Sequence, residues 1–170
     1  MVILIAGATH VGKTAAAQAL LERFKYPYMS LDHLKMALIK SGLTSLTPED
    51  DEELTPYLWG IAAPLIETVI ENGQNLIVEG CYIPFDWKRY FKESCLRHIK
   101  YRCLIMSEDY INCNYDKICG YECVIEKRLY GGAPTKQCLI KENAENLRLC
   151  KKFGLDYVLI DKEYRVDLNL

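Results

Sequence analysis

Residues 1–14 read MVILIAGATHVGKT, and this stretch decides the fold. Residues 2–6 form a continuous apolar run rich in β-branched side chains, which is typical of a buried parallel strand. Alanine and leucine dominate residues 15–20, and these strong helix formers predict a helix over 13–24. Two glycines, a lysine and a threonine stand where the strand gives way to the helix. The opening of the chain therefore predicts a strand, a glycine-containing turn and a helix.

The turn fits the pattern G-x-x-x-x-G-K-[ST], which is typical of a phosphate-binding loop. Its glycines let backbone N–H groups surround an anion, and the following helix adds the positive end of its dipole. In such a loop Lys13 reaches the β- and γ-phosphates, and Thr14 offers its hydroxyl to magnesium. A glycine-rich turn with a solvated lysine is the alternative, but the strand before it and the helix after it favour phosphate. The predicted nucleotide-binding residues of the loop are Gly7, Ala8, Thr9, His10, Val11, Gly12, Lys13 and Thr14.

The composition of the chain restricts its partners. Its 170 residues suggest one domain that is large enough to bury a core. A net charge of −2 gives no strongly basic surface, so nucleic acid is not an expected partner. No apolar run approaches the roughly 20 residues of a membrane span, and the N-terminus lacks the basic leader of a signal peptide. We therefore expect a cytoplasmic protein that does not bind a membrane.

The chain has eight cysteines, which is many for its length. Because a reducing compartment is expected and Cys81 and Cys103 stand in apolar runs, buried free thiols are predicted. The alternative to free thiols is a zinc-binding lid, with Cys113, Cys119, Cys123 and Cys138 as the metal ligands. Their spacing lacks the paired C-x-x-C knuckles of such sites, so zinc is the less favoured prediction.

The rest of the chain alternates strands and helices. Further strands are predicted at 26–30, 75–81, 99–107 and 156–161. Helices are predicted at 31–40, from Thr47 to about residue 72, at 86–97, from 108 to about 129, and at 137–153. Pro56 and Pro64 are expected to kink or divide the second of these helices. The alternation predicts a parallel sheet covered on both faces, with ligands bound beyond the carboxyl ends of the strands.

Two acidic residues stand at predicted strand ends. Asp32 follows the second strand, where its carboxylate can accept a proton from an attacking hydroxyl or help to hold the water shell of magnesium. Glu79 ends the third strand and is the predicted magnesium residue beside Thr14. The alternatives are ordinary: a first-turn helix acid behind a Ser30 cap, and a simple strand-end acid.

Basic residues gather near a predicted break at 130–136. Lys127 and Arg128 precede Gly131-Gly132, where a mobile lid can bring cations over phosphates. Arg128 is the predicted catalytic cation, and Arg148, on the returning helix, is a further candidate nucleotide contact. Both sites can equally be solvated helix surface.

With these residues in place, the chain resembles small P-loop kinases of the nucleoside-monophosphate-kinase-like superfamily. That superfamily includes adenylate, shikimate and gluconate kinases, chloramphenicol phosphotransferase and zeta-toxin-like kinases. Besides the loop, VEG at 78–80 is similar to the acid–glycine pair of adenylate kinase. SLDHLK at 30–35 resembles the strand-two acid of several small-molecule kinases and the matching segment of 2-phosphoglycerate kinase-like proteins. The resemblance implies an α/β/α sandwich with a five-stranded parallel sheet of order 2-3-1-4-5, a helical lid at about 108–138, and ATP with Mg²⁺.

The predicted acceptor region, about residues 31–75, departs from this pattern. Nucleoside monophosphate kinases hold the acceptor phosphate with arginine there, but this stretch contains none. The string expected after Glu79 is replaced by Gly80-Cys81-Tyr82-Ile83-Pro84, which argues against an adenylate kinase proper. Aromatic residues are frequent instead, and those that face the cleft would suit an uncharged or partly apolar molecule. They are Tyr57, Trp59, Tyr82, Phe85 and Trp87.

The leading hypothesis is transfer of a phosphoryl group from ATP to a hydroxyl of a small molecule, with Lys13, Asp32 and Arg128 as catalytic residues. A divergent nucleotide kinase is one alternative. An ATP-binding regulator without phosphotransfer is another, because the loop motif by itself indicates only nucleotide binding. A GTPase is not expected, since the guanine-reading N-K-x-D string is absent.

Overall fold

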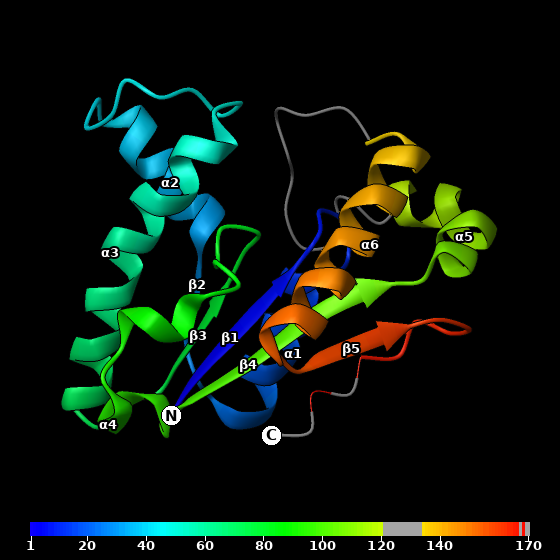
Figure 1. The fold of residues 1–170 in the computed structure, drawn as a ribbon. Helices are drawn as coiled ribbons and strands as arrows, with labels where there is room; N and C mark the ends of the chain where they lie inside the picture. The colour runs from blue at the N-terminus through cyan, green and yellow to red at the C-terminus, as the bar shows by residue number, and fades with distance from the viewer. Residues whose placement is uncertain (121–133, 167, 169–170) are drawn as a thin grey trace.

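A computed structural model describes residues 1–120, 134–166 and 168 of the chain. Its centre is a five-stranded sheet of order β2-β3-β1-β4-β5 in which every neighbouring pair is parallel (Figure 1). The strands are β1 (Val2–Gly7), β2 (Tyr28–Ser30), β3 (Leu76–Glu79), β4 (Ile99–Met106) and β5 (Tyr157–Ile160). The predicted sheet and its strand order are therefore confirmed, with β2 and β3 shorter than the sequence suggests.

Helices cover both faces of this sheet. They are α1 (Lys13–Phe24), α2 (Leu31–Lys40), α3 (Asp51–Glu71), α4 (Glu93–Leu96), α5 (Glu108–Gly120) and α6 (Lys136–Phe153), with a short 3₁₀ helix η1 (Trp87–Tyr90). Successive side chains of β1 point to opposite faces, as in any strand. Val2 and Leu4 pack in a core with α3, whereas Ile3 and Ile5 pack in a second core with α1 and α5. Two apolar cores on one sheet give the expected three-layer sandwich.

The long helix α3 begins later than predicted. The sequence predicts its start at Thr47, but the Thr47 backbone N–H and hydroxyl donate to the Asp50 carboxylate at 2.7 and 2.9 Å, which makes residues 47–50 a turn. Pro56 and Pro64 lie inside one continuous helix, so of the two predicted effects, a kink or a division, the structure excludes the division. Burial explains why the helix persists despite the lost backbone hydrogen bonds, because Leu54, Leu58, Trp59, Ala62, Ala63 and Ile66 all pack into the core.

The prediction of one helix over residues 86–97 is also wrong. The chain forms η1, then extended backbone at Phe91 and Lys92, and then the single turn of α4. The break turns Phe91 into the core, where its ring lies edge-on to Trp59 and Trp87 with centroids 6.1 Å apart in both pairs. Such aromatic contacts, together with the area they bury, outweigh the continuity of a short surface helix.

The cysteines follow the prediction in part. Cys95, Cys103 and Cys150 are buried free thiols, but Cys81 is exposed, because it stands in the loop after β3 rather than within the strand. Among the residues that the structure describes, no three or more histidine, cysteine or acidic side chains gather as a metal site. Cys123, one of the four candidate zinc ligands, lies outside those residues. In the same part of the chain, no helix is long and apolar enough to cross a membrane.

Candidate functional site

Three strand ends bring the predicted site residues to one edge of the sheet. In the parallel register, Glu79 of β3 lies opposite Ser30 of β2 on one side and opposite Ile5 of β1 on the other. The segments that follow these strands are the loop 8–12, the start of α2 and the loop after Gly80. They therefore meet at the carboxyl ends of the strands, as in other open parallel sheets.

The loop between β1 and α1 is built from unusual backbone. Gly7, His10 and Gly12 all have positive φ, at 145°, 60° and 88°. A Cβ on Gly7 would lie 2.6 Å from the Leu104 carbonyl oxygen, so only glycine fits between the loop and β4. Within the loop, the Thr9 hydroxyl and His10 Nδ1 are 2.9 Å apart. This backbone holds the first turn of α1, whose N–H groups lack intrahelical partners, in the position required for binding an anion.

Lys13 is the first residue of α1, and its side chain folds back over the loop. It is buried, and its Nζ donates to the Ala8 carbonyl oxygen at 2.8 Å. A buried ammonium with one backbone partner still has two N–H donors for other acceptors. The lysine is therefore held by the same loop that the sequence predicts to bind phosphate.

Glu79 and Thr14 lie side by side at the base of this loop. Glu79 is only 1% exposed, and the Thr14 hydroxyl donates to its Oε1 at 3.4 Å. A hydroxyl and a carboxylate in contact are oxygen ligands of the kind that Mg²⁺ takes, usually one or two from the protein with phosphate and water completing the shell. The two residues therefore fit a magnesium ion that also binds nucleotide phosphates.

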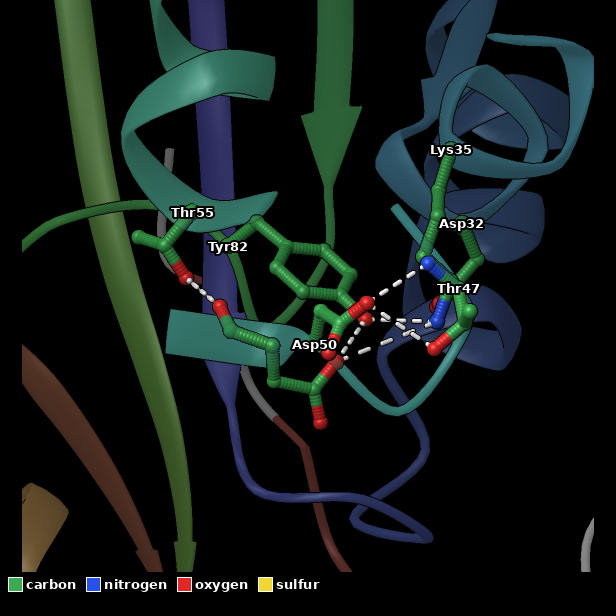
Figure 2. A network of polar contacts seen from close by, with 7 residues as sticks. Asp32, Lys35, Thr47, Asp50, Thr55 and Tyr82 are labelled. Atoms are coloured by element: carbon green, nitrogen blue, oxygen red, sulfur yellow. Dashed lines mark hydrogen bonds and ion pairs between the residues drawn. The ribbon is translucent and has the colours of Figure 1, made fainter. Parts of the chain in front are cut away.

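Asp32 belongs to a polar network that joins α2, α3 and the loop after β3 (Figure 2). Lys35 Nζ donates to the Tyr82 hydroxyl at 2.6 Å, and this hydroxyl in turn donates to Asp51 Oδ1 at 2.6 Å. Lys35 Nζ also lies 3.6 Å from Asp32 Oδ1 and 4.0 Å from Asp51 Oδ1. Ser30, the alternative cap of α2, makes no side-chain capping bond. We call Asp32, Lys35, Asp51 and Tyr82 the acceptor-side network.

Cys81 links this network to the phosphate loop. Its thiol is close enough to Lys13, Lys35, Asp32 and Asp51 for their charges to act on it. Although the residue has access to solvent, the atoms around the thiol displace water, and this burial raises the pKa of Cys81 to about 11. The loop and the network are thus two sides of one site.

The aromatic residues expected near the acceptor serve mainly the core. Trp59 and Trp87 are buried in the core with α3, and Trp87 stacks on Tyr101 with ring centroids 5.9 Å apart. Tyr57 is partly exposed, and its hydroxyl reaches the Leu43 carbonyl oxygen at 3.3 Å. Tyr82 buries its ring but places its hydroxyl in the network. The sequence showed Tyr82 and the acidic run 49–53 separately, and only the fold brings Asp51 to Tyr82.

Of the two arginines predicted to contact the nucleotide or its phosphates, the structure describes only Arg148. Arg148 lies on α6, where its guanidinium holds the Glu145 carboxylate in two contacts of 2.7 and 2.6 Å, and this pairing raises its pKa. Arg128, with Lys127 and Gly131-Gly132, lies outside the described residues. A nucleotide contact from Arg148 or Arg128 stays a prediction.

The C-terminal segment also touches the loop, through a residue that the sequence did not single out. The Tyr164 hydroxyl donates to the Val11 carbonyl oxygen at 3.3 Å. A Cβ on Gly12 would lie 1.8 Å from this hydroxyl. In the sequence, Tyr164 is visible only as an aromatic residue shortly after the last predicted strand. That position does not predict a contact with Val11, which lies 153 residues away in the chain.

Gly12→Ala is expected to weaken ATP binding by about tenfold or more. The new methyl meets the Tyr164 hydroxyl, and the positive φ of Gly12 costs a residue with a side chain roughly 1–2 kcal/mol. Calorimetric titration with Mg-ATP measures the loss. Tyr164→Phe in the Gly12→Ala background removes the clashing oxygen and should restore part of the affinity. Unchanged affinity in Gly12→Ala would show that the loop does not need this backbone conformation.

Comparison with known proteins finds similar structures but no similar sequences. No protein-family model matches the chain, and no curated protein matches it by sequence. Solved structures do match. A gluconokinase from Sinorhizobium meliloti has a TM-score of 0.51 and 16% identity, over 94% of this chain and 81% of that one. A shikimate kinase from Bacteroides thetaiotaomicron has a TM-score of 0.51 and 15% identity, over 99% and 90%.

A sugar kinase from a Janibacter species gives a similar result, with a TM-score of 0.51, 16% identity, and 94% and 84% of the two chains covered. At such low identity these likenesses concern the fold and not the substrate. They agree with the three-layer architecture around a five-stranded parallel sheet. The chain therefore shares the α/β fold of these solved kinase structures.

Proposed function

We propose that this protein is a kinase that transfers the γ-phosphoryl group of ATP to a hydroxyl of a small molecule, with Mg²⁺. The observation that carries the proposal is the meeting, at one edge of the sheet, of Lys13, the Thr14–Glu79 pair and Asp32. A phosphate-binding loop alone would support only nucleotide binding. A carboxylate beyond the neighbouring strand adds the group that a hydroxyl acceptor requires.

Each residue has a distinct part in the proposed reaction. The loop N–H groups and Lys13 bind the β- and γ-phosphates and stabilise the charge that develops there. Thr14 and Glu79 would hold the magnesium ion, which would neutralise phosphate charge. Asp32 orients the acceptor hydroxyl and accepts its proton as its oxygen bonds to the γ-phosphorus. The bond between that phosphorus and the bridging oxygen breaks, and ADP leaves.

Two cations complete the proposal. Arg128 is proposed to stabilise the transferring phosphoryl group from the lid, and Arg148 to contact the nucleotide. For Arg148 this requires the guanidinium to leave Glu145, which is feasible because exposed ion pairs are weak.

The direct test is ADP release from Mg-ATP in the presence of pooled acceptors, with Lys13→Ala protein as the blank. The pools are nucleosides, nucleotides, sugars, hydroxy acids and hydroxyl-bearing antibiotics. Stimulation by one pool, lost in the variant, is the expected result. The strongest stimulation by a nucleoside monophosphate would favour the divergent nucleotide kinase. Tight ATP binding with no stimulation by any pool would favour the regulator and contradict the kinase.

A further inference from the structure

The single lysine of the acceptor-side network, Lys35, contacts other members of the network. The Lys35 side chain is 12% exposed, and its ammonium faces Tyr82, Asp32 and Asp51 at 2.6, 3.6 and 4.0 Å. The same Nζ lies 5.0 Å from the centroid of the Tyr82 ring. An ammonium has three N–H donors, and three partners surround this one. Only the Tyr82 contact is a hydrogen bond, and the Asp32 and Asp51 carboxylates balance the charge of Lys35 as ion-pair partners. An anionic group on a bound molecule would therefore have to compete with two carboxylates for this cation.

The network presents negative charge to solvent. It contains two carboxylates against one ammonium, and the Tyr82 hydroxyl adds no compensating charge. Burial, above all, and then the Cys81 thiol and the Asp51 carboxylate raise the pKa of Tyr82, so its hydroxyl stays protonated. The Asp51 side chain is 66% exposed and that of Asp32 is 35% exposed. The groups that an incoming molecule meets are therefore carboxylate oxygens, which accept hydrogen bonds.

Residues 31–75, all of which the structure describes, place no second cation beside the network. Residues 31–75, which include α2 and α3, contain eight acidic residues, two lysines and no arginine. Of the two lysines, Lys40 is exposed at the last turn of α2, away from the Asp32 end of the helix, and Lys35 is already paired. Carboxylate and phosphate groups are usually held by arginine forks or free lysines, and residues 31–75 place neither of these beside the network.

We infer that the phosphoryl acceptor is a polyhydroxyl compound without negative charge, either neutral or carrying a protonated amine. The inference rests on the proposed kinase function and specifies its substrate class. Hydroxyl and ammonium groups donate hydrogen bonds to Asp32 and Asp51, whereas a carboxylate or phosphate on the acceptor would face two like charges. The network thus selects by repulsion of anions as well as by attraction of donors.

The test compares three acceptor pools in the Mg-ATP assay. The neutral pool holds sugars, polyols and nucleosides, and the cationic pool holds amino sugars, amino alcohols and aminoglycosides. The anionic pool holds sugar acids, hydroxy acids and nucleoside monophosphates. We expect the neutral or the cationic pool to stimulate ADP release at least about tenfold more than the anionic pool.

Asp51→Asn, which leaves Asp32 in place, should reduce this preference at least about threefold, because it makes the network neutral and releases one partner of Lys35. Glu53→Gln is the matched control, since Glu53 is an exposed acid in the same first turn of α3. It should keep the wild-type ratio. Thermal unfolding of both variants checks that they fold.

The outcomes separate the two proposals. Stimulation by the anionic pool that equals or exceeds the others would overturn the inference and leave the kinase intact. The same holds if Asp51→Asn and Glu53→Gln shift the ratio equally. A flat response from every pool would overturn the kinase function, and the inference with it.

Discussion

Lys13→Ala protein is expected to release ADP about 10²–10³ times more slowly than the wild type in the presence of a stimulating acceptor. The lysine is the buried cation of the loop, fixed by its 2.8 Å bond to the Ala8 carbonyl oxygen. In the proposed reaction, its removal takes a positive charge from the place where charge on the γ-phosphoryl group develops. The measurement is the initial rate of ADP formation at saturating Mg-ATP.

Loss of folding has to be separated from loss of chemistry in this variant. Lys141→Ala is the matched control, because Lys141 is an exposed lysine on α6 and far from the loop in the sequence. It should keep the wild-type rate, and all three proteins should unfold cooperatively on heating. A Lys13→Ala protein that is folded and still turns over at the wild-type rate would refute the role assigned to the lysine.

Much of the fold can be predicted from the sequence, for a physical reason. The strand at β1 and the helix α1 have strong local preferences, and the G-x-x-x-x-G-K-T pattern fixes the turn between them. Parallel strands joined by helices then leave few possible topologies. The order β2-β3-β1-β4-β5 follows from the resemblance to small kinases and is found in the structure.

The local sequence pattern mispredicts secondary structure where tertiary contacts determine the backbone conformation. The segment 86–97 carries apolar residues at helical spacing, yet Phe91 adopts extended backbone to reach Trp59 and Trp87. The turn at 47–50 reflects the Asp50 carboxylate, which binds Thr47 instead of leaving Thr47 to cap a helix. Competition between side-chain and helical hydrogen bonds is a matter of small energies that a sequence pattern does not resolve.

The acceptor side of the site was the least predictable part. Asp32 and Glu79 stand directly at strand ends, so their meeting follows from the topology. Asp51, in contrast, lies 31 residues from Tyr82, and its contact with the Tyr82 hydroxyl depends on how the first turn of α3 packs. In the sequence the run 49–53 indicates only a solvated helix start. The inferred preference for an acceptor without negative charge therefore rests on the fold and not on the motif.

Asp32→Asn is expected to lower kcat by about 10²–10⁴ while the dissociation constant of Mg-ATP changes less than about twofold. Asparagine keeps the shape of the side chain but cannot accept a proton from the acceptor hydroxyl. The proposed ATP contacts lie in the loop, which this change leaves alone. The measurements are steady-state turnover with a stimulating acceptor and calorimetric titration of ATP. A single-turnover experiment shows whether the chemical step itself has slowed.

The network offers a control that separates proton acceptance from a general loss of charge. Asp32 and Asp51 both lie near Lys35 Nζ, at 3.6 and 4.0 Å. If Asp32 acted only by neutralising Lys35, then Asp51→Asn would lower kcat as much as Asp32→Asn does. If Asp32 takes the proton, Asp51→Asn changes the preference among acceptors and leaves kcat for a neutral acceptor within a few-fold of the wild type. Equal loss of kcat in the two variants, or wild-type turnover in Asp32→Asn, would therefore place the base elsewhere in the site.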